Sequence, residues 1–282
     1  MDRLTFLGTG GGRFACILQA RATGGIYLQL ARDPALPLAG GNVIRFHIDP
    51  GPGALVRMLA KGFDPLKTDA LLVSHCHPDH YSDTEILVEG MTEGGSVKRG
   101  SLLTSKSVLF GYDEFGPSVS KYHISKPALV KAMAPGDWEE ISGVKVEATK
   151  VVHSDPTSIG FKLHTRNGVI GYVSDTALDP AIGEANLGAR ILILPVTRPL
   201  AARIPFHLDV EDASQIAEVV KPEVIFLNHF GMRVVKDGPE YAAHWIYKKT
   251  GIKTIAAEDN MDVDLGKEIE IVGKRSSDEN PG

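Results

Sequence analysis

A dense run of polar residues directly follows an apolar segment in the first third of the chain. Residues 69–73 read DALLV, which predicts a buried strand, and residues 74–80 read SHCHPDH. A turn at a strand end can direct neighbouring side chains into one cleft, whereas an extended strand sends them to opposite faces. Imidazoles and carboxylates are ligands of zinc and other first-row divalent ions. Four such side chains fall within six positions: His75, His77, Asp79 and His80.

Three later apolar runs end on a residue of the same kind. The residues that follow these runs are His153, Asp175 and His229. Taken singly, each could be a cap or a surface residue, and the first run could be an exposed turn that is rich in histidine by chance. Together they predict one metal-binding cleft, built from strand ends that lie far apart in the sequence.

Short runs typical of β-strands recur along the whole chain, with a few helical patterns between them. Strands are expected at residues 4–7, 26–30, 43–48, 70–73, 144–151, 159–163, 169–173, 191–194 and 224–227. Helices are expected at residues 54–60, from Ser82 with a capping box to Glu85, after Asp209, and at 239–249. This pattern is typical of sheets covered by helices, an α/β arrangement. We predict a single domain over residues 1–273 and a disordered tail over 274–282.

Composition restricts the surroundings in which such a chain works. The 282 residues are 43% hydrophobic, enough for a substantial core, and the formal net charge of −5 provides no general basic surface for nucleic acid. The two cysteines are too few for a disulfide-stapled secreted fold, and no run reaches the roughly 20 apolar residues of a membrane helix. We therefore expect a cytoplasmic protein without membrane contact. A homodimer is expected only from its general frequency among oligomers.

The order of the ligand-type residues resembles the signature of the metallo-β-lactamase superfamily. The HxHxDH motif of that superfamily matches residues 75–80, and a His, an Asp and a His follow at later strand ends. The resemblance implies a four-layer αββα sandwich with the site at one edge, and two bound divalent metal ions. The implied ligands are His75, His77 and His153 for one ion and Asp79, His80 and His229 for the other, with Asp175 bridging them.

Two neighbouring metal ions suit hydrolysis. They can share a hydroxide, lowering the pKa of water toward about 7, and can neutralise a leaving oxygen. Dinuclear redox relatives typically carry Glu in place of the second histidine of the motif, so His77 favours hydrolysis over oxygen reduction. Histidine and carboxylate ligands accept zinc, manganese and iron, of which zinc is our default expectation.

Three further segments resemble the phosphodiesterase branch of the superfamily, which includes RNase Z and the cyclic phosphodiesterase of phosphonate breakdown. They read FLGTGGG at 6–12, IDPG at 48–51 and HLDVEDA at 207–213. In that branch a histidine before the penultimate helix contacts the scissile phosphate, and His207 matches it. His207 is thus expected to bind the phosphate or protonate the leaving oxygen, and with Asp79 it is our candidate for catalysis. A histidine that packs against the sheet is the alternative.

Other residues near these segments have two interpretations. Arg198 and Arg203 precede His207 and could pair with a substrate phosphate, although loop arginines are more often solvated. Asp49 could orient a ligand histidine or cap the next helix. The glycines of residues 8–12 could approach a phosphate, but we expect a tight turn first.

The predicted function is that of a dinuclear hydrolase that cleaves a small cyclic or nucleotide-like phosphodiester with a metal-bridging hydroxide. RNase Z enzymes usually carry a long arm between the third-motif histidine and the bridging Asp, and only residues 153–175 span that interval here. RNA is therefore disfavoured. The alternatives are RNase Z-like cleavage of tRNA 3′ ends, hydrolysis of a lactone or thioester, and a non-catalytic metal-binding protein on the same fold.

Overall fold

The computed structural model describes residues 2–32 and 41–272, so the predicted tail over 274–282 lies outside the described residues. One sheet contains β1 (Arg3–Phe6), β2 (Ile26–Ala31), β3 (Val43–Ile48), β4 (Ala70–Val73), β5 (Ser101–Thr104), β6 (Leu129–Ala132), β14 (Met261–Leu265) and β15 (Ile269–Val272). The other contains β7 (Trp138–Ile141), β8 (Val144–Lys150), β9 (Ile159–Thr165), β10 (Gly168–Tyr172), β11 (Ala189–Pro195), β12 (Val224–Asn228) and β13 (Lys253–Ala256).

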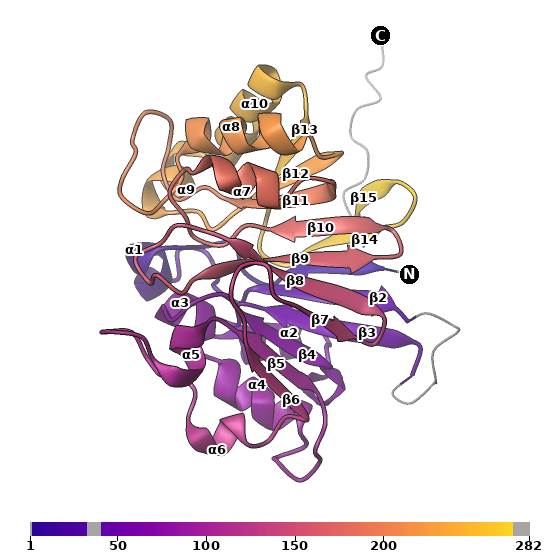
Figure 1. Ribbon diagram of the computed structural model, residues 1–282. Coiled ribbons are helices and arrows are strands. Elements are labelled where there is room, and N and C mark those ends of the chain that lie inside the picture. Colours follow the sequence, from indigo (N-terminus) through magenta and orange to yellow (C-terminus); the bar gives the residue numbers. More distant parts are fainter. Residues whose placement is uncertain (1, 33–40, 273–282) are drawn as a thin grey trace.

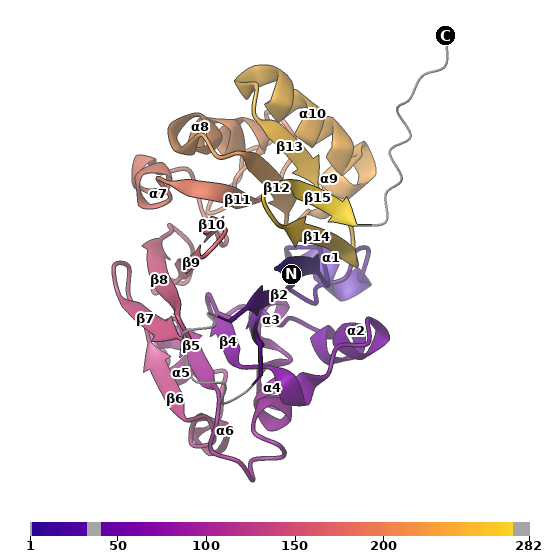
Figure 2. The same ribbon diagram turned by 90° about the vertical axis from the view of Figure 1, so that its right-hand side faces the viewer.

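The helices lie outside these two sheets (Figures 1 and 2). The longer ones are α2 (Ala54–Ala60), α4 (Thr84–Met91), α8 (Val210–Val220) and α10 (Pro239–Thr250). The shorter ones are α1 (Arg13–Leu18), α3 (Pro78–Tyr81), α5 (Lys106–Phe110), α6 (Lys121–Ile124), α7 (Pro180–Ala185), α9 (Met232–Asp237) and the 3-10 turn η1 (Pro65–Lys67). None of these helices combines the length and the apolar character needed to cross a membrane.

The sheets pack face to face because apolar residues on the inner face of both sheets form one shared core. Phe6 of β1 and Phe226 of β12 meet across this interface, with ring centroids 5.5 Å apart. A second apolar cluster lies between the second sheet and α7, α8 and α10, and a third lies between the first sheet and α2, α4 and α5. The resulting α/β/β/α layers confirm the predicted fold class.

The strand order brings distant strand ends together. The first sheet runs β15-β14-β1-β2-β3-β4-β5-β6 and the second β13-β12-β11-β10-β9-β8-β7. Strands β10, β11 and β12 are parallel, so their carboxyl ends reach the same edge. Figure 1 shows α1 and α3, from the N-terminal part of the chain, at that same edge, on the left of the view. The loops after β4, β10 and β12 therefore lie together at this edge.

Two helix starts test the predicted caps. Asp209 caps α8 and forms a reciprocal capping box with Asp212, as the predicted start required. The box predicted between Ser82 and Glu85 is wrong. Ser82 continues the helical turn of α3 and donates its hydroxyl hydrogen to the Pro78 carbonyl 2.6 Å away, so that α4 begins later.

Candidate metal centre

The seven predicted ligands converge at one edge of the sandwich. They come from the loop after β4, from α3, and from the residues that follow β8, β10 and β12. Among the described residues, four groups have ligand atoms that all lie within 4.8 Å of one another. The groups are His75, His77 and His153; His75, His80 and Asp175; Asp79, His80 and His229; and His153, Asp175 and His207. The first and third match the two predicted ligand sets.

The turn after β4 has a simple local origin. All four residues of β4 are buried, so the strand anchors the turn. His77 keeps an extended backbone and Pro78 occupies the first helical position, where its missing N–H costs nothing. The single turn of α3 then follows at once, and the N–H of His80 bonds to the carbonyl of His77 at 2.9 Å. An extended residue followed by one helical turn aims neighbouring side chains into one cleft.

The first group consists of three imidazoles whose nitrogens face one another. His77 Nδ1 lies 3.0 Å from His75 Nε2 and 3.0 Å from His153 Nε2. His153 Nδ1 lies 3.1 Å from the carbonyl oxygen of Phe206. Since a carbonyl only accepts, the hydrogen of His153 sits on Nδ1, and its Nε2 presents a lone pair to the centre.

Burial keeps these histidines neutral. It lowers the pKa of His153 to about 4, against the opposing effect of Asp175. Burial, together with His80 and His153, holds the pKa of His75 well below its usual value. Burial and the neighbouring His80 also lower the pKa of His77. Converging lone pairs on neutral imidazoles repel one another unless a cation lies between them, which is the donor arrangement that a divalent metal requires.

The second group is more acidic. His80 Nε2 lies 3.2 Å from His229 Nε2 and 3.8 Å from Asp79 Oδ2, and Asp79 Oδ2 lies 3.4 Å from His229 Nε2. Burial alone would lower the pKa of His80, but Asp79 and Asp49 outweigh it and raise that pKa well above its usual value. These carboxylates hold a positive charge in the group, so the same surroundings suit a metal cation.

Asp175 lies between the two groups and is buried. Its Oδ2 is 3.8 Å from His80 Nε2 and 3.9 Å from His153 Nε2. Its Oδ1 is 3.1 Å from His229 Nδ1 yet has no hydrogen-bond partner within the part of the chain that is described. Burial alone would raise its pKa, but His229 and His80 hold the pKa well below its usual value. A buried carboxylate oxygen without a partner is costly, and a bound cation would satisfy it.

Asp49 forms hydrogen bonds that hold residues of this centre in place. It accepts hydrogen bonds from the N–H and hydroxyl of Ser74, both at 2.7 Å, from His80 Nδ1 at 2.9 Å and from the Tyr172 hydroxyl at 2.6 Å. The following helix α2 has Gly53 as its N-cap. Of the two interpretations of Asp49, the structure therefore supports the orienting partner and not the helix cap.

The glycine run packs against two of the predicted ligands. A Cβ on Gly11 would lie 2.1 Å from the His229 ring, so only glycine allows this approach. The N–H of Gly12 donates to Asp79 Oδ2 at 3.0 Å. The run does not form the expected tight turn: residues 8–12 contain no hydrogen-bonded turn, and Gly10 instead forms a bridge with Phe230.

The three predicted substrate-binding residues have different positions. His207 Nδ1 lies 3.0 Å from the Pro205 carbonyl, and its Nε2 lies 3.6 Å from Asp175 Oδ2, so the ring faces the centre. Arg203 is paired with Asp212 of α8. Arg198 donates from Nε to the Ala202 carbonyl at 3.1 Å. The loop and α8 engage both guanidinium groups, and their role toward a phosphate stays a prediction.

Asp155 is a supporting residue that the sequence analysis missed. It is fully buried and accepts hydrogen bonds from the N–H of Cys76 at 3.1 Å, from the N–H of Thr157 at 2.9 Å and from the Ser107 hydroxyl. It thereby connects the loop after β4 to α5. The bond to Thr157 is an Asx turn, and an Asp that precedes Pro-Thr just after His153 was the available signal.

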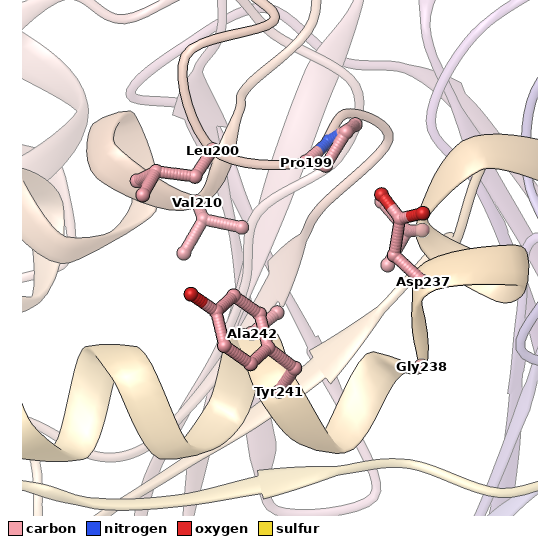
Figure 3. A pocket seen from close by; sticks show the side chains of 8 residues that line it. Pro199, Leu200, Val210, Asp237, Gly238, Tyr241 and Ala242 are labelled. Atoms are coloured by element: carbon pink, nitrogen blue, oxygen red, sulfur yellow. The ribbon is translucent and has the colours of Figure 1, made fainter.

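A separate hollow of about 360 Å³ is lined in part by Pro199 and Leu200, which belong to the loop that carries Arg198 and His207. Figure 3 shows apolar side chains around it, with the Tyr241 hydroxyl and the Asp237 carboxylate at its sides. Its lining residues are Pro199, Leu200, Val210, Val234, Asp237, Gly238, Tyr241 and Ala242. None of the predicted ligands is among them, so the metal centre is a different site.

Similarity to known proteins agrees with this geometry. A family profile described as the beta-lactamase superfamily domain matches residues 44–230, the part of the chain that includes all seven predicted ligands. The chain belongs to the metallo-β-lactamase superfamily. The superfamily assignment, together with the His and Asp clusters, supports the use of a divalent metal.

Similarity to relatives extends over most of the chain. An uncharacterized protein of Methanocaldococcus jannaschii is 42% identical over 264 residues, which cover 93% of this chain and 94% of that protein. A metal-dependent hydrolase of Methanosarcina barkeri is 23% identical, covering 72% and 84%. A ribonuclease Z of Mycobacterium is 26% identical, covering 82% and 84%. The superfamily member described here is a metal-dependent hydrolase.

Solved structures show the same fold. The metallo-β-lactamase fold protein YhfI of Bacillus subtilis superposes with a TM-score of 0.72 at 18% identity, covering 93% of this chain and 98% of that one. A diphosphatase of the PhnP family superposes with a TM-score of 0.65 at 20% identity, covering 93% and 96%. These likenesses support the αββα architecture.

Proposed function

We propose that this superfamily member is a dinuclear metal-dependent phosphodiesterase that cleaves a small cyclic or nucleotide-like phosphodiester. The observation that carries the proposal is the position of His207, whose Nε2 lies 3.6 Å from Asp175 Oδ2 beside two groups of ligand-type residues. Relatives named ribonuclease Z and a structural neighbour named diphosphatase act on phosphate groups, which supports this class of substrate.

The residues present fit two divalent ions, with zinc as the first expectation and manganese or iron as alternatives. His75, His77 and His153 would hold one ion, Asp79, His80 and His229 the other, and Asp175 would lie between them. The unpartnered Oδ1 of Asp175 and the converging nitrogens of the first group support this fit. When bound, such ions supply a hydroxide nucleophile and neutralise charge on the phosphate.

His207 is oriented for a role in proton transfer or phosphate binding. The Pro205 carbonyl accepts from Nδ1–H, so the second nitrogen, Nε2, faces the centre. In its protonated form that nitrogen donates to a phosphate oxygen or passes a proton to the leaving oxygen. Asp79, our other candidate for catalysis, accepts from Gly12 N–H and retains acceptor capacity for the attacking water.

The size of the substrate follows from what surrounds the centre. Only residues 153–175 separate the third-motif histidine from Asp175, and no long arm lies there to hold an RNA. Cleavage of a tRNA 3′ end is the second candidate, favoured by the ribonuclease Z relative. We further propose that residues 1–273 act as one domain in the cytoplasm.

Metal replacement combined with a His207 variant tests the proposal. Protein stripped of metal and reloaded with zinc, manganese or iron is assayed with bis(p-nitrophenyl) phosphate, a lactone and a thioester. We expect at least one metal to restore diester cleavage. His207→Ala should lower kcat for the diester by about 100-fold with unchanged metal content, because proton transfer contributes roughly 10²- to 10⁴-fold.

The matched control is His164→Ala, because His164 pairs with Glu147 at 3.3 Å on the second sheet and contacts no predicted ligand. It should retain full activity. Restored cleavage of only the lactone or thioester would overturn the phosphodiesterase proposal. Loss of metal in His207→Ala would instead make His207 a ligand, since its nitrogen also lies within the group of His153 and Asp175.

A further inference from the structure

Two aromatic rings each contact one of two adjacent predicted ligands. Phe115, in the loop between α5 and α6, has its ring centroid 5.7 Å from that of His77. Phe206, in the loop between β11 and α8, has its ring centroid 6.2 Å from that of His153. The rings of His77 and His153 are themselves 4.9 Å apart. We call Phe115 and Phe206 the aromatic rim.

The conformation of Phe206 indicates that its ring contacts a ligand. Its backbone has φ +64°, a left-handed conformation that is unusual and strained for a bulky residue. Its carbonyl oxygen orients His153, which a glycine or asparagine at this position could do with less strain. The phenyl ring is nevertheless present, and the residue is 41% exposed. An exposed ring on a strained backbone beside a catalytic centre points to contact with a ligand.

The pairing of the charged groups near the centre also favours an apolar contact with the substrate. Arg203 is paired with Asp212, and Arg198 is bonded to the Ala202 carbonyl. Their engagement with the protein favours a substrate held by the metals at its phosphate and by apolar contact elsewhere. A planar ring meets that need, because stacking on an aromatic side chain uses its π face and tolerates different substituents.

We propose that the aromatic rim selects phosphodiesters that carry a nucleobase, which stacks on Phe206 or Phe115 while the phosphate occupies the metal centre. This inference rests on the proposed function and narrows it to nucleotide-like esters. The reaction is ordinary hydrolysis: water adds to phosphorus, the P–O bond to the leaving group breaks, and the leaving oxygen takes a proton.

Two substrates with the same leaving group isolate the contribution of the base. Thymidine 5′-p-nitrophenyl phosphate and methyl p-nitrophenyl phosphate both release p-nitrophenol, and only the first carries a base. We expect the wild type to prefer the thymidine ester. Phe206→Leu should raise KM for that ester by about 10-fold, the effect of losing one stacked base, and so lower the ratio of kcat/KM for the thymidine ester to that for the methyl ester by about 10-fold. Phe206→Tyr should restore the preference.

Binding provides a readout that does not depend on turnover. In the metal-loaded protein, Phe206→Leu should weaken binding of thymidine 5′-monophosphate by about 10-fold and leave binding of inorganic phosphate unchanged. Phe115→Leu makes the same test from the other loop, in case Phe206→Leu fails to fold. The control is Tyr247→Leu, whose side chain is 48% exposed on α10 and should not affect either ligand.

The outcomes separate the two proposals. If the wild type cleaves both esters with equal kcat/KM, or if the leucine variants lose both equally, the aromatic rim has no role in selection, while the phosphodiesterase proposal stands. If Phe206→Leu instead converts a dimer to a monomer, the ring belongs to an interface and the inference falls. If the metal-loaded wild type cleaves neither ester, the proposed function is wrong, and this inference, which rests on it, is wrong as well.

Discussion

The two groups of predicted ligands differ in the chemistry of their surroundings. In the first, the Ser74 hydroxyl lies 2.9 Å from His75 Nδ1 and the Phe206 carbonyl accepts from His153, so the supporting partners are neutral. In the second, His80 is bonded to the carboxylate of Asp49, and Asp79 supplies another carboxylate.

The pKa values follow this division. Burial lowers the pKa of His75 and His153, whereas nearby carboxylates overcome burial and raise the pKa of His80. The first group is therefore a set of neutral nitrogen donors, and the second is a mixed nitrogen and oxygen site with negative charge. In our proposal the two ions are held by different balances of lone pairs and charge.

Asp175 lies between the two groups and near ligands of both, so its loss should have the largest effect. Asp175→Ala removes the carboxylate that lies near His80, His153 and His229. We expect both metal equivalents to be lost and diester turnover to fall by at least about 1,000-fold, because the metal-bound nucleophile is lost. Metal analysis of the dialysed protein and the diester assay measure this. Asp179→Ala, at the half-buried N-cap of α7, is the control and should keep both metals.

The second prediction concerns whether the groups act separately. His77→Ala should release one metal equivalent and leave the ion held by Asp79, His80 and His229. His229→Ala should release the other and spare the first group. Turnover should fall by about 100-fold or more in each, because a shared nucleophile needs both ions. Measurement of the metal content per chain tests whether each variant releases one ion. Release of both ions by either variant would show that the two groups form a single unit.

The contrast between the groups also explains how far sequence reasoning reached. His75, His77, Asp79 and His80 lie within one turn, so their common direction could be predicted from a strand followed by Pro78. The strand ends that carry His153, Asp175 and His229 could be recognised as part of the same cleft. The assignment of each residue to one metal ion needed the family resemblance, because periodicity predicts strands but not their order in two sheets. The predicted domain boundary and ligand roles stay predictions.

Supporting residues were harder to predict. Tyr172 lies at the end of β10 and reaches Asp49 across the interface between the sheets, over a separation of 123 residues. Asp155 holds the loop after β4 from the other half of the chain. Such partners are set by packing between distant elements, for which a single sequence has no local signal. The Ser82 error has a related cause, since the adjacent turn of α3 outcompeted the expected cap.

The third prediction sharpens the contrast at Asp49. Asp49→Asn retains the shape of the side chain but removes the charge that holds His80. We expect the affinity for the second ion to fall by about 10- to 100-fold, the usual effect of losing a partner behind a ligand. Titration with a chelator should then release that ion well before the first. Asp64→Asn, at the exposed cap of η1, is the control, and equal weakening of both ions would contradict the contrast.

The smallest effect tests the physical basis of the contrast in a histidine outside both groups. His47 is fully buried, and its Nε2–H donates to the Gly24 carbonyl at 2.7 Å. Burial lowers its pKa to about 4, although that bond and Asp49 oppose the shift. The unfolded chain, with a histidine pKa of about 6.5, therefore binds more protons between these two pH values. Acidification through this window should destabilise the fold.

For a single group with these pKa values, the loss of unfolding free energy between pH 7 and pH 5.5 is about 1 kcal/mol. In metal-free protein, His47→Gln should make the pH dependence of unfolding shallower by that amount, because glutamine can donate to Gly24 without taking up a proton. Urea unfolding at the two pH values measures the difference, with His164→Gln, at a half-buried position, as the control. An unchanged slope would mean that burial does not keep His47 neutral, and the same explanation for His75 and His153 would lose its support.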